Sequence, residues 1–449
     1  MKKIYLLSLI SIMLGFSFSA LAGTVTMKTN KAVGEKLSLA LNGDMSVNLT
    51  WGDGTTETFA SNGQLREVTV KSESLTITTD KDITALYVCE DGLTELNVSA
   101  APSLKRLFCS DNALTQLDLS KCTELTHLDC QDNQLTGITI GSLKIEHVNI
   151  SGNQLRSTGL KSNGVSNIKS LLCAGNNMTT ISYLSSMTNM QTFLCQNNQL
   201  SSLSISKCKA LRDLVAFNNQ LVALNTPALP ILFNLYVDNN QLETLDFSGN
   251  PGIQHISAGG NNLKELTWAN KTNGVYDNVT YVNLANNALF FNSFPTIYNY
   301  SSRKYTMDAE LTPQRPYHLM DAANINEAYA LRETFVTNGW TAGVNAALTM
   351  KDANGATLES NTDYTYRSGQ LTFLKAHPGV VISAESRYYP DIILTTEPFN
   401  VIDPTGISVV ENENTIDTGR IYDIQGRQTL GLPSQKGIYI VNGKKIVIR

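Results

Sequence analysis

The sequence predicts a mostly β protein. Its centre is a solenoid of stacked turns that share a parallel β-sheet, with a β cap before it and a β-sandwich after it. Three observations predict this fold class. One eleven-residue pattern recurs between residues 83 and 289, and short segments that alternate apolar and polar residues both precede and follow it. A single repeat of this length cannot bury its own apolar face, so consecutive repeats have to stack.

The clearest copy of the repeat is LKRLFCSDNAL at residues 104–114, which gives the pattern L-x-x-L-x-(small apolar)-x-x-N-x-L. A polar anchor recurs every 20 to 26 residues. An asparagine amide offers a donor and an acceptor to the backbone of a turn, so each anchor should stabilise the fold by roughly 1 to 3 kcal/mol. The predicted ladder begins with Asp91 and continues through Asn112, Asn133, Asn153, Asn176, Asn198, Asn219, Asn240, Asn261 and Asn287.

This pattern resembles the short bacterial leucine-rich repeats of secreted and surface proteins, including the internalin-like ones. The resemblance covers residues 83–299. It implies a leucine-rich repeat solenoid with a parallel β-sheet horseshoe, and it implies that the concave face of the sheet binds another macromolecule.

The alternation of the strands places every second side chain on the outer face of the sheet. The middle of this face is apolar, and contiguous apolar surface usually marks an interaction site. The alternative is that β-formers simply suit strands, whichever way they point. The predicted binding residues are Leu172, Leu194, Val215, Phe217 and Tyr236, with Tyr87, Phe108, Arg106, Asp213 and Asp238 as a secondary set.

The expected function is non-enzymatic binding of a protein partner, on a host or bacterial surface, without a cofactor. The chain has no H-E-x-x-H, G-x-S-x-G, P-loop or Rossmann glycine pattern. A net charge of -5 disfavours nucleic acid and anionic membrane as partners. Two alternatives remain. A glycan could stack on Tyr87, Phe108, Tyr236 and Tyr281, or an enzyme site could lie in the C-terminal β domain.

Three polar residues form a weak candidate for a metal site. His127 and His147 share one outward column on adjacent strands, and Asp129 follows two residues after His127. Structural zinc sites normally need four well-placed ligands, so no metal is predicted and a solvated polar patch is favoured.

The seven cysteines are expected to be free thiols. Cys109, Cys130, Cys173 and Cys195 occupy the inward position that Val or Ala fills in other repeats. Neighbouring strands would nevertheless bring Cys109 near Cys130 and Cys173 near Cys195, so cross-linking of these pairs stays open. Cys89 is expected to point outward.

The N-terminal region contains an export signal and a cap. Residues 1–22 combine Lys2 and Lys3, an apolar run and the small-residue pair Ala20 and Ala22, as in a secretory signal peptide. No later stretch is long and apolar enough for a membrane helix, so a secreted or cell-surface protein is expected. Residues 23–82 alternate as a small β cap.

The C-terminal region is expected to hold two parts. Residues 300–402 alternate in short segments and resemble an immunoglobulin-like (Ig-like) β-sandwich without its paired cysteines. Residues 403–449 form a linker and a tail that resembles the C-terminal sorting domain of Bacteroidetes type IX secretion, on the segments 422–423, 426–427, 436–441 and 444–445. The alternative is a hairpin, residues 437–441 with 445–448, that completes the neighbouring β domain.

Overall fold

The structure is a computed structural model that describes residues 23–157, 159–268, 279–294, 298–299, 304–305, 308–331, 346–386, 389–404, 407–409, 421–423, 437–441 and 444–448. The predicted signal peptide lies outside these residues. The chain forms two compact units. The first contains the described residues up to Ala285 together with Tyr305 and β25 (Asp308–Glu310), and the second contains the other described residues from Asn286 onward.

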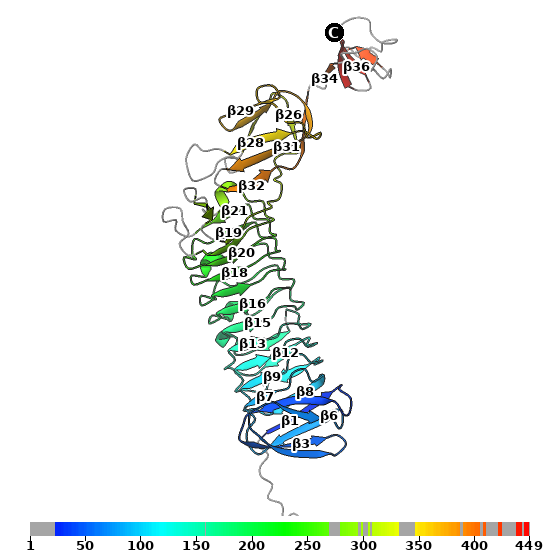
Figure 1. Cartoon of the computed structure of the whole chain (residues 1–449), viewed down its shortest axis with the longest axis vertical. Coiled ribbons are helices and arrows are strands. Elements are labelled where there is room, and N and C mark those ends of the chain that lie inside the picture. Colours follow the sequence, from blue (N-terminus) through cyan, green and yellow to red (C-terminus); the bar gives the residue numbers. More distant parts are fainter. Residues whose placement is uncertain are drawn as a thin grey trace, which may run out of the picture. The chain divides into compact units, whose positions relative to one another are not determined.

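A thirteen-stranded sheet, called here the long sheet, runs through the first unit. Figure 1 shows its short strands stacked one per turn. Eleven of them are parallel, in register and consecutive in space, which confirms the predicted fold class. They are β7 (Ala85–Tyr87), β9 (Arg106–Phe108), β11 (His127–Asp129), β13 (His147–Asn149), β15 (Ser170–Leu172), β16 (Thr192–Leu194), β17 (Asp213–Val215), β18 (Asn234–Tyr236), β20 (His255–Ser257), β22 (Tyr281–Asn283) and β25 (Asp308–Glu310).

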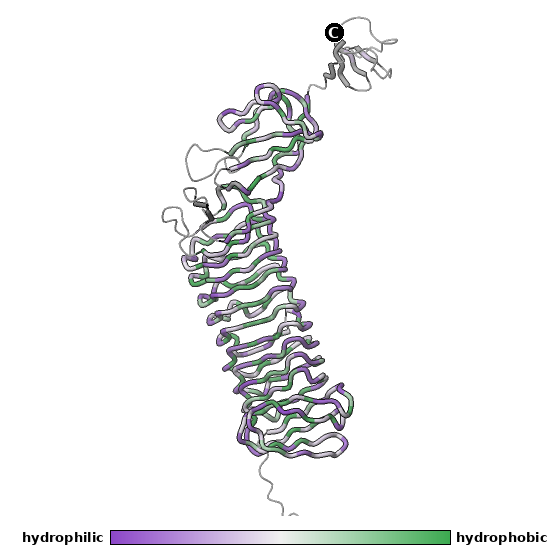
Figure 2. The backbone as a smooth tube through the Cα atoms, viewed as in Figure 1, coloured by the Kyte–Doolittle hydropathy of each residue, from purple (hydrophilic) through white to green (hydrophobic). Residues whose placement is uncertain are grey.

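In the parallel strands from β7 to β22, the central residue is buried, and the flanking residues face outward except for the buried Ser257 of β20. Leu107, Leu128 and Val148 are directly opposite one another and are almost fully buried. Figure 2 shows hydrophobic residues recurring in every turn of the stack. Because the side chains of a strand alternate, this register fixes which residues face solvent.

The opposite wall of the solenoid is less regular. It contains two small parallel sheets and three 3-10 turns among the described residues. Residues 159–167, where one repeat is longer than its neighbours, form one strand and one 3-10 turn. The elements of this wall are β10 (Leu117–Leu119), β12 (Ile138–Ile140), β14 (Leu160–Ser162), η1 (Val165–Asn167), η2 (Leu184–Ser186), η3 (Thr226–Ala228), β19 (Thr244–Asp246) and β21 (Glu265–Thr267).

The asparagine ladder is built as the repeat predicts. The Nδ2 group of Asn219 donates to the carbonyl oxygens of Cys195 at 3.0 Å, Ala216 at 3.1 Å and Phe217 at 3.3 Å, and its Oδ1 accepts the N–H of Leu200 at 2.9 Å. Each anchor therefore ties its own turn to the preceding one. The same pattern recurs from Asn112 to Asn261, and Asn287 is also buried.

The residue before each anchor adopts a left-handed backbone conformation. Asn218, for example, has φ 54° and Gly175 has φ 61°. Only glycine and short polar residues such as Asn or Asp tolerate this region well. This explains the composition of the column except for Glu90: the column is Glu90, Asp111, Asp132, Gly152, Gly175, Asn197, Asn218, Asn239, Gly260 and Asn286.

We expect Gly175→Ala to destabilise the protein by about 1 to 2 kcal/mol, because a Cβ is disfavoured at positive φ. An added Cβ would meet its nearest atom at 3.6 Å, so the effect is conformational and not steric. The control is Gly252→Ala, which has no positive φ and open space around it. Urea unfolding measures both variants, and equal stability of the two would contradict this explanation.

The N-terminal cap continues both sheets of the first repeat. Strand β2 of the cap pairs antiparallel with β7, and β5 pairs with β2, so these two strands extend the long sheet. Strand β8 of the first repeat joins the cap's own sheet. This pairing covers the end of the solenoid core. The strands are β1 (Gly23–Thr29), β2 (Lys36–Leu41), β3 (Met45–Trp51), β4 (Thr56–Ser61), β5 (Arg66–Thr69), β6 (Ser74–Thr79) and β8 (Leu93–Ala100).

Asp91 is the first rung of the ladder and makes a different set of contacts. Its Oδ1 accepts the backbone N–H of Ser38 at 2.8 Å and the Lys31 ammonium at 3.2 Å, both from the cap. Burial raises the pKa of the Asp91 carboxyl. No repeat precedes Asp91, so an acceptor-only side chain suits the donors that the cap supplies.

The seven cysteines are free and buried thiols. Cys89 was expected to point outward, and it lies beside the outward-facing Tyr87, but it is buried, with only 6 % of the residue accessible. Burial raises the pKa of the Cys122 and Cys208 thiols to about 11 and that of Cys173 to about 12. Deprotonation, which precedes oxidation or alkylation, is therefore disfavoured in the folded state.

We expect seven free thiols per chain when the unreduced protein is unfolded, and slow alkylation of the native protein at neutral pH because its thiols stay protonated. A colorimetric thiol reagent with and without denaturant measures both. Fewer than about five thiols in the unfolded, unreduced protein would mean that neighbouring ladder cysteines are cross-linked.

Within the second unit, the described residues between 322 and 402 form two small sheets. Phe373 on one contacts Phe399 on the other at 5.9 Å between ring centroids, so the sheets share a core. A tight turn at Ser368–Gly369 joins β29 to β30. The Ig-like topology stays a prediction. The strands are β26 (Ala322–Asn324), β27 (Ala328–Ala330), β28 (Ala347–Lys351), β29 (Tyr364–Arg367), β30 (Gln370–Phe373), β31 (His377–Ser386), β32 (Tyr389–Thr395) and β33 (Phe399–Ile402); β23 (Tyr298–Asn299), β24 (Lys304–Tyr305) and η4 (Phe291–Ser293) precede them.

The tail forms a sheet of its own. The predicted hairpin is present, with Gly437 opposite Ile448 and Val441 opposite Lys444. It does not complete the neighbouring sandwich, because its sheet partners in the described chain are other tail strands. These strands are β34 (Ile407–Val409), β35 (Ile421–Asp423), β36 (Gly437–Val441) and β37 (Lys444–Ile448). No helix in the described part of the chain is long and apolar enough to cross a membrane.

Candidate binding face

The candidate site is the outward side of the long sheet, called here the sheet face. Four apolar residues lie directly opposite one another on the consecutive strands β15 to β18: Leu172, Leu194, Val215 and Tyr236. All four are half-buried. Phe217, also half-buried, lies two residues after Val215 and continues the same alternation. These five residues are called the apolar row, and the register places them outside the core.

Two acidic residues next to the apolar row are held by neighbours within the sheet. Asp213 Oδ1 accepts a hydrogen bond from Asn234 Nδ2 at 2.6 Å. Asp238 Oδ1 accepts from the hydroxyl of Ser257 at 2.7 Å and the backbone N–H of Gly259 at 2.9 Å. Their carboxylates are therefore positioned before any partner arrives.

The C-terminal end of the sheet face is a polar network that sequence reasoning did not identify. His255 Nδ1 lies 2.7 Å from Asn234 Oδ1, and the Tyr281 hydroxyl donates to Glu310 at 3.3 Å. Burial and the Glu310 carboxylate raise the pKa of Tyr281. The repeat period places these polar residues on the outer side of their strands, but only the stacking of β17 to β25 brings them together.

The three residues of the weak metal candidate make other contacts. The rings of His127 and His147 stack face to face with centroids 4.6 Å apart, and Asp129 Oδ1 accepts the backbone N–H of Gln131 at 3.2 Å. Within the described residues no group of three His, Cys, Asp or Glu side chains is placed to hold a metal ion. Burial and the adjacent His147 lower the pKa of His127, which keeps the stacked pair from being doubly charged near neutral pH.

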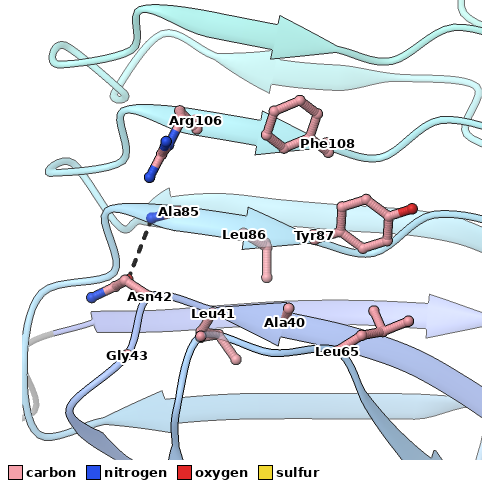
Figure 3. Close-up of a pocket in the computed structure, with 11 residues that line it drawn as sticks. Ala40, Leu41, Asn42, Gly43, Leu65, Ala85, Leu86, Tyr87, Arg106 and Phe108 are labelled. Atoms are coloured by element: carbon pink, nitrogen blue, oxygen red, sulfur yellow. Dashed lines mark hydrogen bonds between the residues drawn. The ribbon is translucent and has the colours of Figure 1, made fainter.

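The secondary residues Tyr87, Phe108 and Arg106 meet at the N-terminal end of the sheet face. They line an open pocket of about 510 Å³ together with the cap, which contributes Leu65 from the β4–β5 turn (Figure 3). The rings of Tyr87 and Phe108 are 6.2 Å apart and tilted by 38°. The cap side of this end pocket was missed because it depends on the long-range pairing of β2 with β7. The complete lining is Ala40, Leu41, Asn42, Gly43, Gly63, Leu65, Ala85, Leu86, Tyr87, Arg106 and Phe108.

Comparison with solved structures finds leucine-rich repeat proteins and internalins. The functional domain of InlJ from Listeria monocytogenes, which includes a cysteine ladder, is 15% identical with a TM-score of 0.27, covering 73% of this chain and 93% of that one. The internalin InlF from Listeria monocytogenes is 15% identical with a TM-score of 0.36, covering 52% and 88%. The APL1 leucine-rich repeat domain is 23% identical with a TM-score of 0.39, covering 43% and 51%.

These TM-scores are below 0.5, so the fold assignment rests on the chain's own repeat geometry. No protein-family model matches the chain. No curated protein matches it either.

Proposed function

We propose that this chain is an exported, non-enzymatic binding protein whose sheet face docks a protein partner on the apolar row. The observation that carries the proposal is the placement of Leu172, Leu194, Val215 and Tyr236 on four consecutive strands, all facing outward. At the spacing of neighbouring strands, the row extends for about 15 Å. That length is sufficient for a central cluster of anchor residues.

The surroundings of the row support a protein partner. Burial of one of its apolar side chains should contribute roughly 1.5 to 3 kcal/mol, whereas the pre-positioned Asp213 and Asp238 would set orientation and association rate. Protein interfaces have this arrangement of an apolar centre and a polar rim.

A glycan is less well supported on the sheet face as a whole. Tyr87 and Phe108 are neighbours, but Tyr236 and Tyr281 lie on β18 and β22, with β20 between them. The four aromatic residues therefore form no continuous platform for stacked sugar rings. A glycan array probes this alternative directly.

An enzyme site in the second unit is also less well supported. Glu327 and Asp363 are carboxyl groups there whose pKa departs from the ordinary value, and hydrogen bonds lower it in both cases. The Tyr329 hydroxyl donates to Glu327 at 2.8 Å, and the Lys375 ammonium donates to Asp363 at 2.8 Å. A general acid needs the opposite, a pKa raised by burial, so these contacts are better explained as surface ion pairs and hydrogen bonds.

Export is the second part of the proposal. It is supported by the signal-like residues 1–22 and by the tail, which resembles a type IX sorting domain of Bacteroidetes. Delivery to the cell surface or the medium would present the sheet face to a host or bacterial surface protein.

The test is a pull-down with the mature protein from host and bacterial surface extracts, compared with the Leu194→Glu variant. A protein retained by the wild type and lost from the variant supports docking on the apolar row. A protein retained equally by both places the interaction elsewhere.

A further inference from the structure

The end pocket combines aromatic walls with a single charge. Leu65 is 57% exposed and Tyr87 is 39% exposed, although both are apolar side chains bordering a concave surface. Arg106 is the charged residue among the eleven that line the pocket, and the lining contains no carboxylate. A guanidinium beside apolar walls attracts an anion attached to an apolar group.

The other polar side chains of the lining are already engaged. Asn42 Oδ1 accepts the N–H groups of Thr84 at 2.8 Å and Ala85 at 3.3 Å, and its Nδ2 donates to the Asp82 carbonyl at 3.2 Å. The Cys89 thiol lies beside the Tyr87 hydroxyl and raises its pKa. Among the lining side chains, the Arg106 guanidinium therefore remains as the polar group that can bind a ligand. A sugar has several hydroxyl groups that need hydrogen-bond partners, so a pocket with one such group does not suit it.

The spacing of the groups limits the size of the ligand. Arg106 and Phe108 are two residues apart on β9, about 7 Å along the strand, and Tyr87 is opposite Phe108 on β7. A ligand that touches all three needs its carboxylate and its apolar group within that distance. The last residue of a polypeptide carries both on one Cα atom.

The charged neighbours of Arg106 leave it available. His127 is directly opposite Arg106 on β11, and burial together with His147 lowers the pKa of His127. Asp129 is opposite Phe108, and its carboxylate already accepts the Gln131 N–H. An incoming carboxylate therefore meets the guanidinium next to an imidazole that stays neutral near pH 7.

We infer that the end pocket binds the C-terminal residue of a polypeptide, with its carboxylate on Arg106 and its apolar side chain between Tyr87 and Phe108. This inference rests on the proposed function, because it gives the protein partner a second contact at the end of the sheet face. The pocket lies beyond β11 and β13 from the first strand of the apolar row, so the two contacts are separable.

Calorimetric titration of the mature protein with N-acetyl-Ala-Ala-Phe, as the free acid and as the C-terminal amide, tests the inference. The free acid should bind at least tenfold more tightly, because the amide lacks the charge that pairs with the guanidinium. Arg106→Gln should remove the difference between acid and amide. Arg156→Gln, at an exposed arginine outside the pocket, should preserve it.

A second variant tests the shape of the pocket separately from the charge of Arg106. Ala85→Leu narrows the pocket from the outer side of β7 and should weaken acid and amide by the same factor. Equal binding of acid and amide by the wild type, or no binding of either at millimolar concentration, would overturn the inference without requiring any variant to fold. Tighter, Arg106-dependent binding of glucuronic acid would overturn it in favour of an acidic sugar.

The peptide test is independent of the apolar row. The probe contacts neither Leu194 nor Tyr236, so its failure leaves the proposed function standing. Conversely, normal partner binding by Leu194→Glu would reject docking on the apolar row and leave the peptide result unaffected.

Discussion

Leu194→Glu is expected to weaken partner binding tenfold or more, about 1.4 kcal/mol, with nearly the same melting temperature as the wild type. The reason is the register. Leu194 is half-buried on the outer side of β16, whereas the neighbouring Phe193 is fully buried in the core. A charge at Leu194 therefore opposes burial under a partner without entering the core. Tyr236→Glu on β18 is expected to have the same effect.

The matched control is Leu143→Glu, which adds the same charge at a leucine that is 61% exposed and lies outside the sheet face. Calorimetry or surface plasmon resonance gives the affinity, and a thermal melt gives the stability. Unfolding of Leu194→Glu would show that this position faces the core. Unchanged affinity would show that the partner uses another surface.

Asn219→Ala is expected to destabilise the fold by roughly 1 to 3 kcal/mol, because it leaves the N–H of Leu200 without its acceptor in a buried position. The carbonyls of Cys195 and Ala216 lose one donor each but keep a second, from Asn198 and Asn240 respectively. The orphaned N–H therefore dominates the loss.

Urea unfolding of Asn219→Ala should be compared with Gln220→Ala, an exposed neighbour in the same turn. The control is expected to differ from the wild type by less than about 0.5 kcal/mol. A similar result for Asn219→Ala would mean that water replaces the rung and that the ladder does not hold the turns together.

The repeat region could be predicted because each of its constraints is local. The apolar spacing fixes which residues of a turn point inward, and one anchor per turn satisfies groups only a few residues away or one turn away. Leu194 could therefore be placed outside the core from the period alone. The left-handed column was also visible in the composition, since Gly, Asn or Asp precedes almost every anchor.

The remaining features depend on contacts that the period does not contain. The pairing of β2 with β7 joins residues more than forty positions apart, and this pairing creates the end pocket and the contact of Asp91 with Ser38. The period correctly placed His127 and His147 next to each other on the outer side of adjacent strands, but their rings stack on each other. Side-chain rotation decides that outcome, and the spacing of residues does not specify it.

The most direct test of the sheet face is site-specific photo-crosslinking. A photoreactive phenylalanine analogue replaces Val215 in the apolar row or, as a control, Val222, which is 57% exposed and lies outside the sheet face. Each protein is irradiated in a surface extract, and its adducts are separated by mass. We expect a discrete protein adduct from position 215 and none from position 222. An adduct from position 222 alone, or the same adducts from both positions, would contradict docking on the apolar row.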